Sequence, residues 1–486
     1  MPWRKDYVIL AYKTFAWREF LCIICGMKNE RSVSVGLILA IAGLGGLLYG
    51  VDFGVIAAAE PYLMSLGIYS GTRVSLVVGA VMFGGLLSSL TAGVLCDRIG
   101  RKKMIVASAA MFLAAIPFVC MFLENFAVLF SARVLQGMSA GYMAVVMPMY
   151  LTETLPPEIR GRGTGVFQFF LGLGLVVAAG AGCLVATYYG ASDAEGITAS
   201  GMASAWRANF WWTMAPVAVL FLGSLRLPES PVWKGRRNVA NIANANVADC
   251  QLELGIETGN NSTFATFSSL MSRRYVVPFA LACLVLLFNK TTGMSSFTSY
   301  LVSILHNAGF DGIFANWGQL AVKLTNMIVT IFAAAIIDKK GRTWLLKTGV
   351  AGMTIGLAAI GSVFLAIERF GVEANNFTGL LTLLSFFFMQ VFYALGPGIC
   401  VWLVLSELMP TRIRANGMAI ALFMNQLAAC GLASTFRPWV EAWGWSSMFF
   451  FFAANGVLYF ITALFIPETK GKSLEELEHL FERKEK

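Results

Sequence analysis

Four ionisable side chains fall inside long apolar stretches of the sequence: Asp52, Arg133, Lys290 and Lys323. A charge in such surroundings is costly, so each is expected to have a function or a partner. Pairing Asp52 with Arg133 reduces the cost of burying both charges. If the pair separates, dry surroundings favour the protonated form of the acid. The two residues therefore predict a reversible proton-binding site, and the alternative is a structural ion pair that never titrates.

The composition of the chain indicates what positions these charges. Of its 486 residues, 57% are hydrophobic and only 13% are charged, where a soluble protein of this size has about a quarter charged residues. This balance argues against a soluble enzyme, a disordered chain and a nucleic-acid-binding protein. The net charge of +9 is spread over many segments and does not indicate an acidic partner. We therefore predict an all-α integral membrane protein that contacts the lipid bilayer.

A membrane-spanning helix needs about 20 mostly apolar residues. Unpaired backbone groups are too costly in lipid for open strands, and the stretches run apolar without alternation, so helices are expected. Twelve stretches qualify, near 33–58, 74–96, 104–122, 127–149, 164–188, 208–225, 275–304, 314–337, 345–366, 379–405, 415–436 and 445–466.

The 36 Lys and Arg residues predict the orientation of the chain. With the N-terminus in the cytoplasm, most of them fall on cytoplasmic segments. Only Arg73, Arg207, Arg369 and Arg437 are then assigned to the outside. The positive-inside rule thus predicts that both termini are cytoplasmic. We expect a multi-pass protein of the plasma (or bacterial inner) membrane.

The long polar insertion divides the apolar stretches into six and six. The expected organisation is a basic N-terminal segment (1–32), an N-terminal bundle (33–226), a linker with short helices (227–274), a C-terminal bundle (275–466) and a tail (467–486). Nine cysteines and two histidines show no spacing typical of a metal site. We expect no metal and no bound cofactor.

Charged motifs repeat in the same order in both halves. Asp-x-x-Gly-Arg-type turns follow the second and eighth stretches, a Glu precedes an Arg by seven residues after the fourth and tenth, and Pro-Glu-Ser/Thr closes each half. Duplicated halves are typical of rocking transporters that hold substrate near the membrane midplane. Ion pairs between such residues can hold one state and break in the other. The residues of this predicted latch are Asp97, Arg98, Gly100, Arg101, Glu153, Arg160 and Glu229, and Asp338, Gly341, Arg342, Glu407, Arg414 and Glu468. The alternative is that they are ordinary charges near the membrane surface.

Together these pieces resemble the sugar porter family of the major facilitator superfamily, and in particular its xylose– and hexose–proton symporters. The resemblance runs from Gly45 to Glu482 and includes Gly45–Asp52, Arg133–Gly137 and Pro228–Pro231. It implies twelve helices in two pseudo-symmetric six-helix bundles. It also implies that Asp52 is the proton site, that Arg133 is its partner, and that the proton gradient is the energy source.

Substrate contacts follow from the same resemblance. A sugar site needs amides, hydroxyls and an aromatic platform. The matching positions are Gln168, Asn289, Lys290, Ser295, Trp402, Asn425 and Gln426. For the amides the alternative is bonding between helices, and for Trp402 it is packing.

The seventh stretch departs from the family pattern. Where the family has Gln-Gln-x-x-Gly-x-Asn, this chain has Asn289-Lys290-Thr291-Thr292-Gly293-Met294-Ser295. Ordinary hexose contacts are therefore in question. We hypothesise that Lys290 receives an anionic group, such as the carboxylate of a uronate. The alternatives are that Lys290 pairs with Asp52 or is uncharged, and that Lys323 lies among carbonyls at helix ends.

The expected function is alternating-access transport of a sugar or a similar solute by a monomer, driven by proton symport. A facilitator with a structural Asp52, and a symporter for a sugar acid, are the alternatives within transport. A sugar sensor is disfavoured by the short tail after Gly471. An enzyme is disfavoured because no nucleophile–base set and no metal motif is present.

Overall fold

The structure is a computed structural model that describes residues 35–468, except 195–196, 236, 238–272 and 410–413. Its helices in chain order are α2 (Val35–Ser65), α3 (Gly71–Ile99), α4 (Arg101–Met121), α5 (Phe126–Thr154), α6 (Pro157–Tyr189), α7 (Ala199–Trp211), α8 (Met214–Ser224), α11 (Arg273–Thr291), α12 (Met294–Asn307), α13 (Gly312–Lys340), α14 (Arg342–Phe370), α15 (Asn376–Leu395), α16 (Pro397–Leu408) and α17 (Arg414–Leu464).

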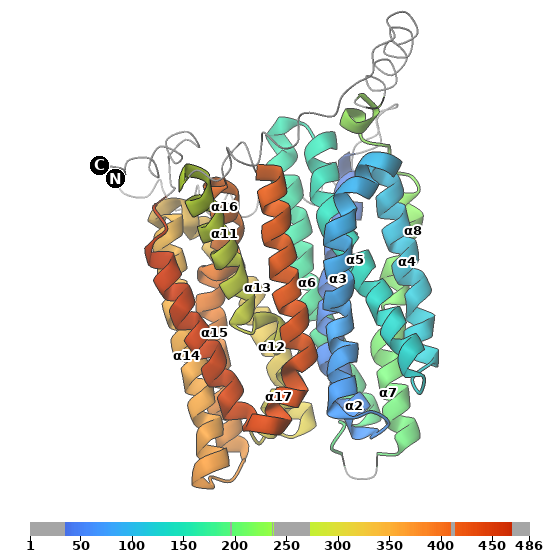
Figure 1. Cartoon of the computed structure of the whole chain (residues 1–486). Coiled ribbons are helices and arrows are strands. Elements are labelled where there is room, and N and C mark those ends of the chain that lie inside the picture. Colours follow the sequence, from blue (N-terminus) through green and yellow to red (C-terminus); the bar gives the residue numbers. More distant parts are fainter. Residues whose placement is uncertain (1–34, 195–196, 236, 238–272, 410–413, 469–486) are drawn as a thin grey trace, which may run out of the picture.

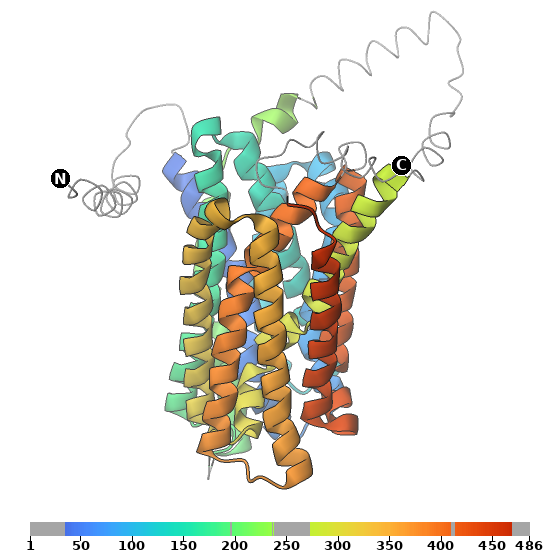
Figure 2. The same ribbon diagram turned by 90° about the vertical axis from the view of Figure 1, so that its left-hand side faces the viewer.

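The helices form two bundles that lie side by side. Helices α2 to α8, coloured blue to green, make the N-terminal bundle, and helices α11 to α17, coloured yellow to red, make the C-terminal bundle (Figure 1). A view turned by 90° shows that the long helices run along one common direction (Figure 2). We call the end with the turns at Gly100 and Gly341 the basic end, and the end with the turns at Gly67 and Gly371 the far end.

The described helices account for the twelve predicted membrane crossings. Within the described part of the chain, nine helical segments are long and apolar enough to cross a bilayer. The sixth crossing is α7 followed by α8, and it begins at Ala199, earlier than the predicted 208. The last two crossings are the arms of α17, which turns at Gly444, where φ is +83°.

Two crossings that apolarity predicted as continuous helices are broken. The seventh divides into α11 and α12 at Gly293, which has a left-handed backbone. The tenth divides into α15 and α16 at Gly396. Hydropathy does not register such breaks because it averages over a long window, and the residues further along on both sides are apolar. The predicted short helices of the linker, the N-terminal segment 1–32 and the tail from 469 onward lie outside the described residues.

Glycines bring the backbones of α2 and α6 into direct contact. A Cβ on Gly46 would lie 2.2 Å from the carbonyl oxygen of Phe167, and a Cβ on Gly50 would lie 2.1 Å from that of Leu171. A third glycine, Gly54, approaches Ala178 in the same way. Only glycine permits such a close approach, which holds α2 in a fixed register against α6.

A second set of glycines joins α3 to α5. A Cβ on Gly84 would lie 2.2 Å from the carbonyl oxygen of Val134, and a Cβ on Gly137 would lie 2.1 Å from that of Val81. These contacts fix the middle of α5, the part that carries Arg133.

Adding a methyl group at Gly50 is expected to destabilise the N-terminal bundle. Gly50→Ala forces the backbones of α2 and α6 apart, and overpacking of this kind costs about 1–3 kcal/mol. Thermal unfolding of the purified protein in detergent should show a lowered Tm. Gly93→Ala is the matched control, because a Cβ at Gly93 meets nothing within 4 Å. An equal Tm for the two variants would contradict the assigned contact.

Candidate functional site

Asp52 of α2 and Arg133 of α5 lie against each other inside the N-terminal bundle. Arg133 Nη1 donates to Asp52 Oδ1 over 3.4 Å, and both side chains are 0% exposed. The two residues are 81 positions apart in sequence, and the glycine contacts of α2 and α5 bring them together. The pairing expected from their opposite charges is therefore present.

The pair is incompletely satisfied. Among the described residues, Asp52 Oδ2 and two of the guanidinium nitrogens of Arg133, Nε and Nη2, have no hydrogen-bond partner. The guanidinium also donates to Gln136 Oε1 over 2.7 Å and stacks over the ring of Phe210, 5.3 Å from its centroid. Arg133 is thus held by other groups than Asp52, and the carboxylate has one oxygen free to accept a proton.

Polar side chains lie near the break between α11 and α12, inside the C-terminal bundle. Lys290, at the end of α11, donates from Nζ to Ser295 Oγ over 3.1 Å. Lys323 of α13 donates to Thr298 Oγ1 over 3.2 Å. The structure contradicts two of the alternatives considered for these lysines. Lys290 does not pair with Asp52, which pairs with Arg133, and Lys323 donates to a hydroxyl and not to helix-end carbonyls.

The other predicted substrate residues have different surroundings. Asn289 is buried. Asn425 donates to the carbonyl oxygen of Leu286 over 2.9 Å, so it ties α17 to α11, as in the alternative that amides bond between helices. The side chain of Trp402 lies outside the described residues.

Two predicted amides lie at the boundary of the halves. Gln168 is exposed and lies one turn before Gly172, which faces Met327 of the C-terminal bundle. Gln426 of α17 lies against Gly85 of α3, where a Cβ would be 2.7 Å from its Nε2. Both residues therefore face the opposite half, which suits contacts to a substrate held between the bundles.

A charged network holds the basic end of the N-terminal bundle. The guanidinium of Arg101 bonds Glu153 at 3.0 Å and Asp97 at 3.0 Å. Glu229 Oε1 accepts from the backbone N–H groups of Arg101 and Lys102, each over 2.9 Å, and so caps the start of α4. A carboxylate is favourable at this position because the first N–H groups of a helix have no partner within it.

The C-terminal bundle repeats this capping. Glu468 accepts from the backbone N–H groups of Arg342 (3.1 Å) and Thr343 (3.2 Å), at the start of α14. Gly100 and Gly341 both have positive φ, +102° and +93°, which gives each turn the same shape. The repeated Pro-Glu motif therefore has one structural role in both halves.

The described contacts of this latch stay within each half. Arg98 is exposed. The side chains of Arg160, Asp338, Glu407 and Arg414 lie outside the described residues. A role for the latch in holding one state of the transporter stays a prediction.

A buried ion pair joins the two halves at the far end, and sequence reasoning missed it. Arg437 of α17 donates from Nη2 (2.6 Å) and Nε (3.1 Å) to Glu60 Oε1 of α2. Ser303 of α12 donates to the other oxygen of Glu60 and accepts from Arg437 Nη2 over 2.9 Å. Glu60 is 0% exposed. Both halves contribute to this network, so it closes the far end.

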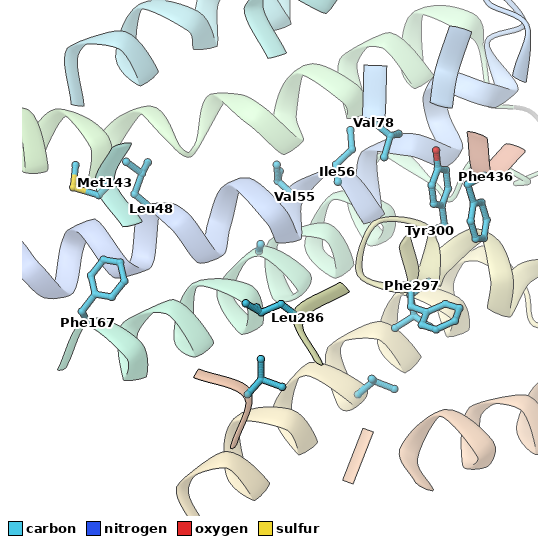
Figure 3. Packing of buried hydrophobic residues seen from close by; sticks show 14 of the residues in the cluster. Leu48, Val55, Ile56, Val78, Met143, Phe167, Leu286, Phe297, Tyr300 and Phe436 are labelled. Carbon is cyan, nitrogen blue, oxygen red and sulfur yellow. The ribbon is translucent and has the colours of Figure 1, made fainter. Parts of the chain in front are cut away.

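Tyr300 extends the far-end network. Its hydroxyl lies 3.1 Å from Ser75 Oγ of α3 and 3.1 Å from the carbonyl oxygen of Ala433. Its ring stacks on Phe436 with 4.3 Å between centroids, and the two rings lie face to face in Figure 3. A second link between the halves is Asp193, which bonds His306 at 3.0 Å and caps Gly312 of α13 over 2.9 Å.

The sequence predicts that Arg437 lies outside the membrane and that the first helix ends near residue 58. The structure extends α2 to Ser65 and runs the first arm of α17 past Arg437. The apolar Pro61-Tyr62-Leu63 after Glu60 was the available signal that the helix continues.

Known proteins resemble this chain over nearly its whole length. The family described as "Sugar (and other) transporter" matches residues 38–481. The arabinose–proton symporter of Bacillus subtilis is 30% identical over 470 residues, covering 93% of this chain and 96% of the relative. The galactose–proton symporter of Escherichia coli K12 is 29% identical, covering 90% and 92%.

Solved structures show the same fold. The crystal structure of a D-xylose–proton symporter has a TM-score of 0.72 at 22% identity, covering 90% of this chain and 99% of that one. The inward-open xylose transporter XylE of E. coli has a TM-score of 0.71 at 23% identity, covering 91% and 99%. These matches confirm the predicted major facilitator fold. The family match confirms the resemblance stated above: the chain belongs to the family of sugar (and other) transporters.

Proposed function

We propose that this protein is a secondary transporter that moves a sugar or sugar-like solute by alternating access, coupled to proton symport. The observation that carries the proposal is the fully buried Asp52–Arg133 pair with its free carboxylate oxygen. The relatives named as arabinose–proton and galactose–proton symporters support both the substrate class and the coupling.

The coupling step follows from the contacts of the pair. A proton that binds Asp52 converts the carboxylate to a neutral acid and removes its attraction for Arg133. The guanidinium keeps its 2.7 Å bond to Gln136 and its place over Phe210, so it need not move when the acid is released. Protonation thereby frees α2 from α5 at this level, and deprotonation restores the pair.

The conformation of the molecule fits one of the two alternating states of the transport cycle. Described contacts close the far end through Glu60–Arg437 and Asp193–His306. Gln168, nearer the basic end, is exposed on the face that meets the C-terminal bundle. With the orientation proposed from the Lys and Arg distribution, the basic end is cytoplasmic. The described arrangement is then inward-facing.

The remaining assignments complete the proposal. The protein is proposed to reside in the plasma or bacterial inner membrane with both termini in the cytoplasm. One chain holds both halves, so a monomer is proposed to suffice. No bound cofactor is needed when the proton gradient supplies the energy.

Uptake in proteoliposomes tests the proposal. Radiolabelled pentoses, hexoses, polyols and uronates are offered with an inward proton gradient, with and without a protonophore. The expected result is accumulation of one solute class above equilibrium, abolished by the protonophore. Uptake that only equilibrates under both conditions would show a facilitator, and no uptake of any solute would overturn the transport proposal.

A further inference from the structure

Two lysines, the buried Lys323 and the half-buried Lys290, contact α12 inside the C-terminal bundle. Lys290 binds Ser295 and Lys323 binds Thr298. The two hydroxyl-bearing residues are three positions apart on α12, so their Cβ atoms are about 5–6 Å apart on one face. Residues from α11 and α13 thus bring two ammonium groups to neighbouring points on α12.

These lysines have no carboxylate partner among the described residues. The other two buried cations of the membrane region are compensated, Arg133 by Asp52 and Arg437 by Glu60. Lys323 is only 4% exposed, and its hydrogen bond goes to the neutral hydroxyl of Thr298. Uncompensated positive charge at this depth is expensive and points to a function.

Two buried polar side chains without partners lie on the same two helices, α13 and α12. Gln319, one turn before Lys323 on α13, is 0% exposed, and neither its Nε2 nor its Oε1 has a partner. Ser296, in the first turn of α12, is also 0% exposed, and its Oγ has no partner. A buried amide with both ends free is ready to donate to and accept from a polar ligand.

The start of α12 adds a positive field. Gly293 breaks the crossing. Because glycine has no side chain, it cannot cap the first N–H groups of α12. A helix start inside a membrane favours an anionic group. Lys323 lies on the same side of α13 as Asn316 and Met327, which face Gly182 and Gly172 of α6. Lys323 therefore lies on the side of α13 that faces the boundary between the halves.

We propose that Lys290, Lys323 and the start of α12 form an anion subsite, and that the substrate is a sugar acid whose carboxylate binds there. This inference rests on the proposed transport function and names its substrate class. One carboxylate neutralises part of the lysine charge, while Gln319 and Ser296 bond the hydroxyls of the sugar. A neutral sugar would leave both ammonium groups without a counter-charge.

The test compares galacturonate with galactose, which share a ring and differ in the carboxylate. Binding is measured on the full-length protein by calorimetry, and uptake is measured separately in proteoliposomes. We expect galacturonate or a related uronate to bind more tightly than its neutral counterpart. Lys290→Gln and Lys323→Gln should each weaken uronate binding about tenfold or more, because each removes a buried charge contact.

Controls separate the subsite from the fold and from transport. Lys103→Gln, an exposed lysine of α4, should leave uronate binding unchanged. The double variant Lys290→Gln with Lys323→Gln should keep the thermal stability of the parent protein, which shows that any loss of uronate binding does not come from unfolding. If a neutral sugar is accumulated and no uronate binds or competes, the sugar-acid inference is wrong while the transport proposal stands. If a uronate binds through the lysines but is never transported, the subsite stands and the transport proposal fails. Competition by hexose phosphates alone would also overturn the choice of a carboxylate.

Discussion

Asp52→Asn is expected to abolish gradient-driven accumulation, so that the internal substrate level falls to the external level. Asparagine keeps the shape of the side chain but does not take up a proton, so the Asp52–Arg133 contact no longer changes during the cycle. Exchange of labelled for unlabelled substrate at equal pH should persist within a few-fold, since exchange requires no net proton movement. Accumulation ratio and exchange are measured on the same proteoliposomes.

The variant leaves Arg133 buried without a counter-charge, which costs about 3–5 kcal/mol when a buried pair is broken. The double variant Asp52→Asn with Arg133→Gln removes this penalty and should again exchange without accumulating. Glu124→Gln, an exposed carboxylate beside the turn between α4 and α5, is the matched control and should accumulate normally. Accumulation that survives in Asp52→Asn would place the proton site elsewhere and leave Asp52 structural.

Arg437→Met is expected to open the far end of the molecule. Glu60 would then stay buried with Ser303 as its remaining described partner. The cost of about 3–5 kcal/mol arises only while the halves are closed over Glu60, because opening returns the carboxylate to water. At about 1.4 kcal/mol per tenfold, the equilibrium shifts toward the open far end by roughly 10²-fold to a few thousandfold.

Spin labels report this opening directly. Cysteines introduced at Ile68 and Phe370, both exposed and on opposite halves at the far end, carry the labels. The distance between labels should be short and narrowly distributed in the parent protein and longer in Arg437→Met. Net uptake should slow as well, because the closed state is needed in each cycle.

A variant that removes both charges of the pair is the control for this prediction. The double variant Glu60→Gln with Arg437→Met has no unpaired charge and should return most of the molecules to the short distance. A single variant with an unchanged distance distribution would show that the pair does not govern closure of the far end.

Local sequence features were sufficient to predict the membrane helices and to find the repeated residues that cap α4 and α14. The length of an apolar run reports a membrane crossing because the bilayer thickness is fixed. The duplicated Pro-Glu motifs led to Glu229 and Glu468, which both cap the helix that follows a glycine turn. These features depend on residues close in sequence or on motifs repeated within it, so they can be read without coordinates.

The pairing of Asp52 with Arg133 could be predicted from the sequence for a different reason. Only a few charges fall within apolar runs, so opposite charges in the same half had few possible partners. Their incomplete hydrogen bonding and the role of Gln136 required the coordinates, because the helix register set by glycine contacts decides them.

Contacts between the halves were decided by the tertiary structure alone. Glu60 and Arg437 are 377 positions apart, and each lay at the uncertain end of a predicted helix. The meeting of Lys290 and Lys323 on one edge of α12 depends on the break at Gly293 and on the rotation of α13. Apolar periodicity shows which residues avoid water, but the way in which two finished bundles pack against each other determines which buried charges meet.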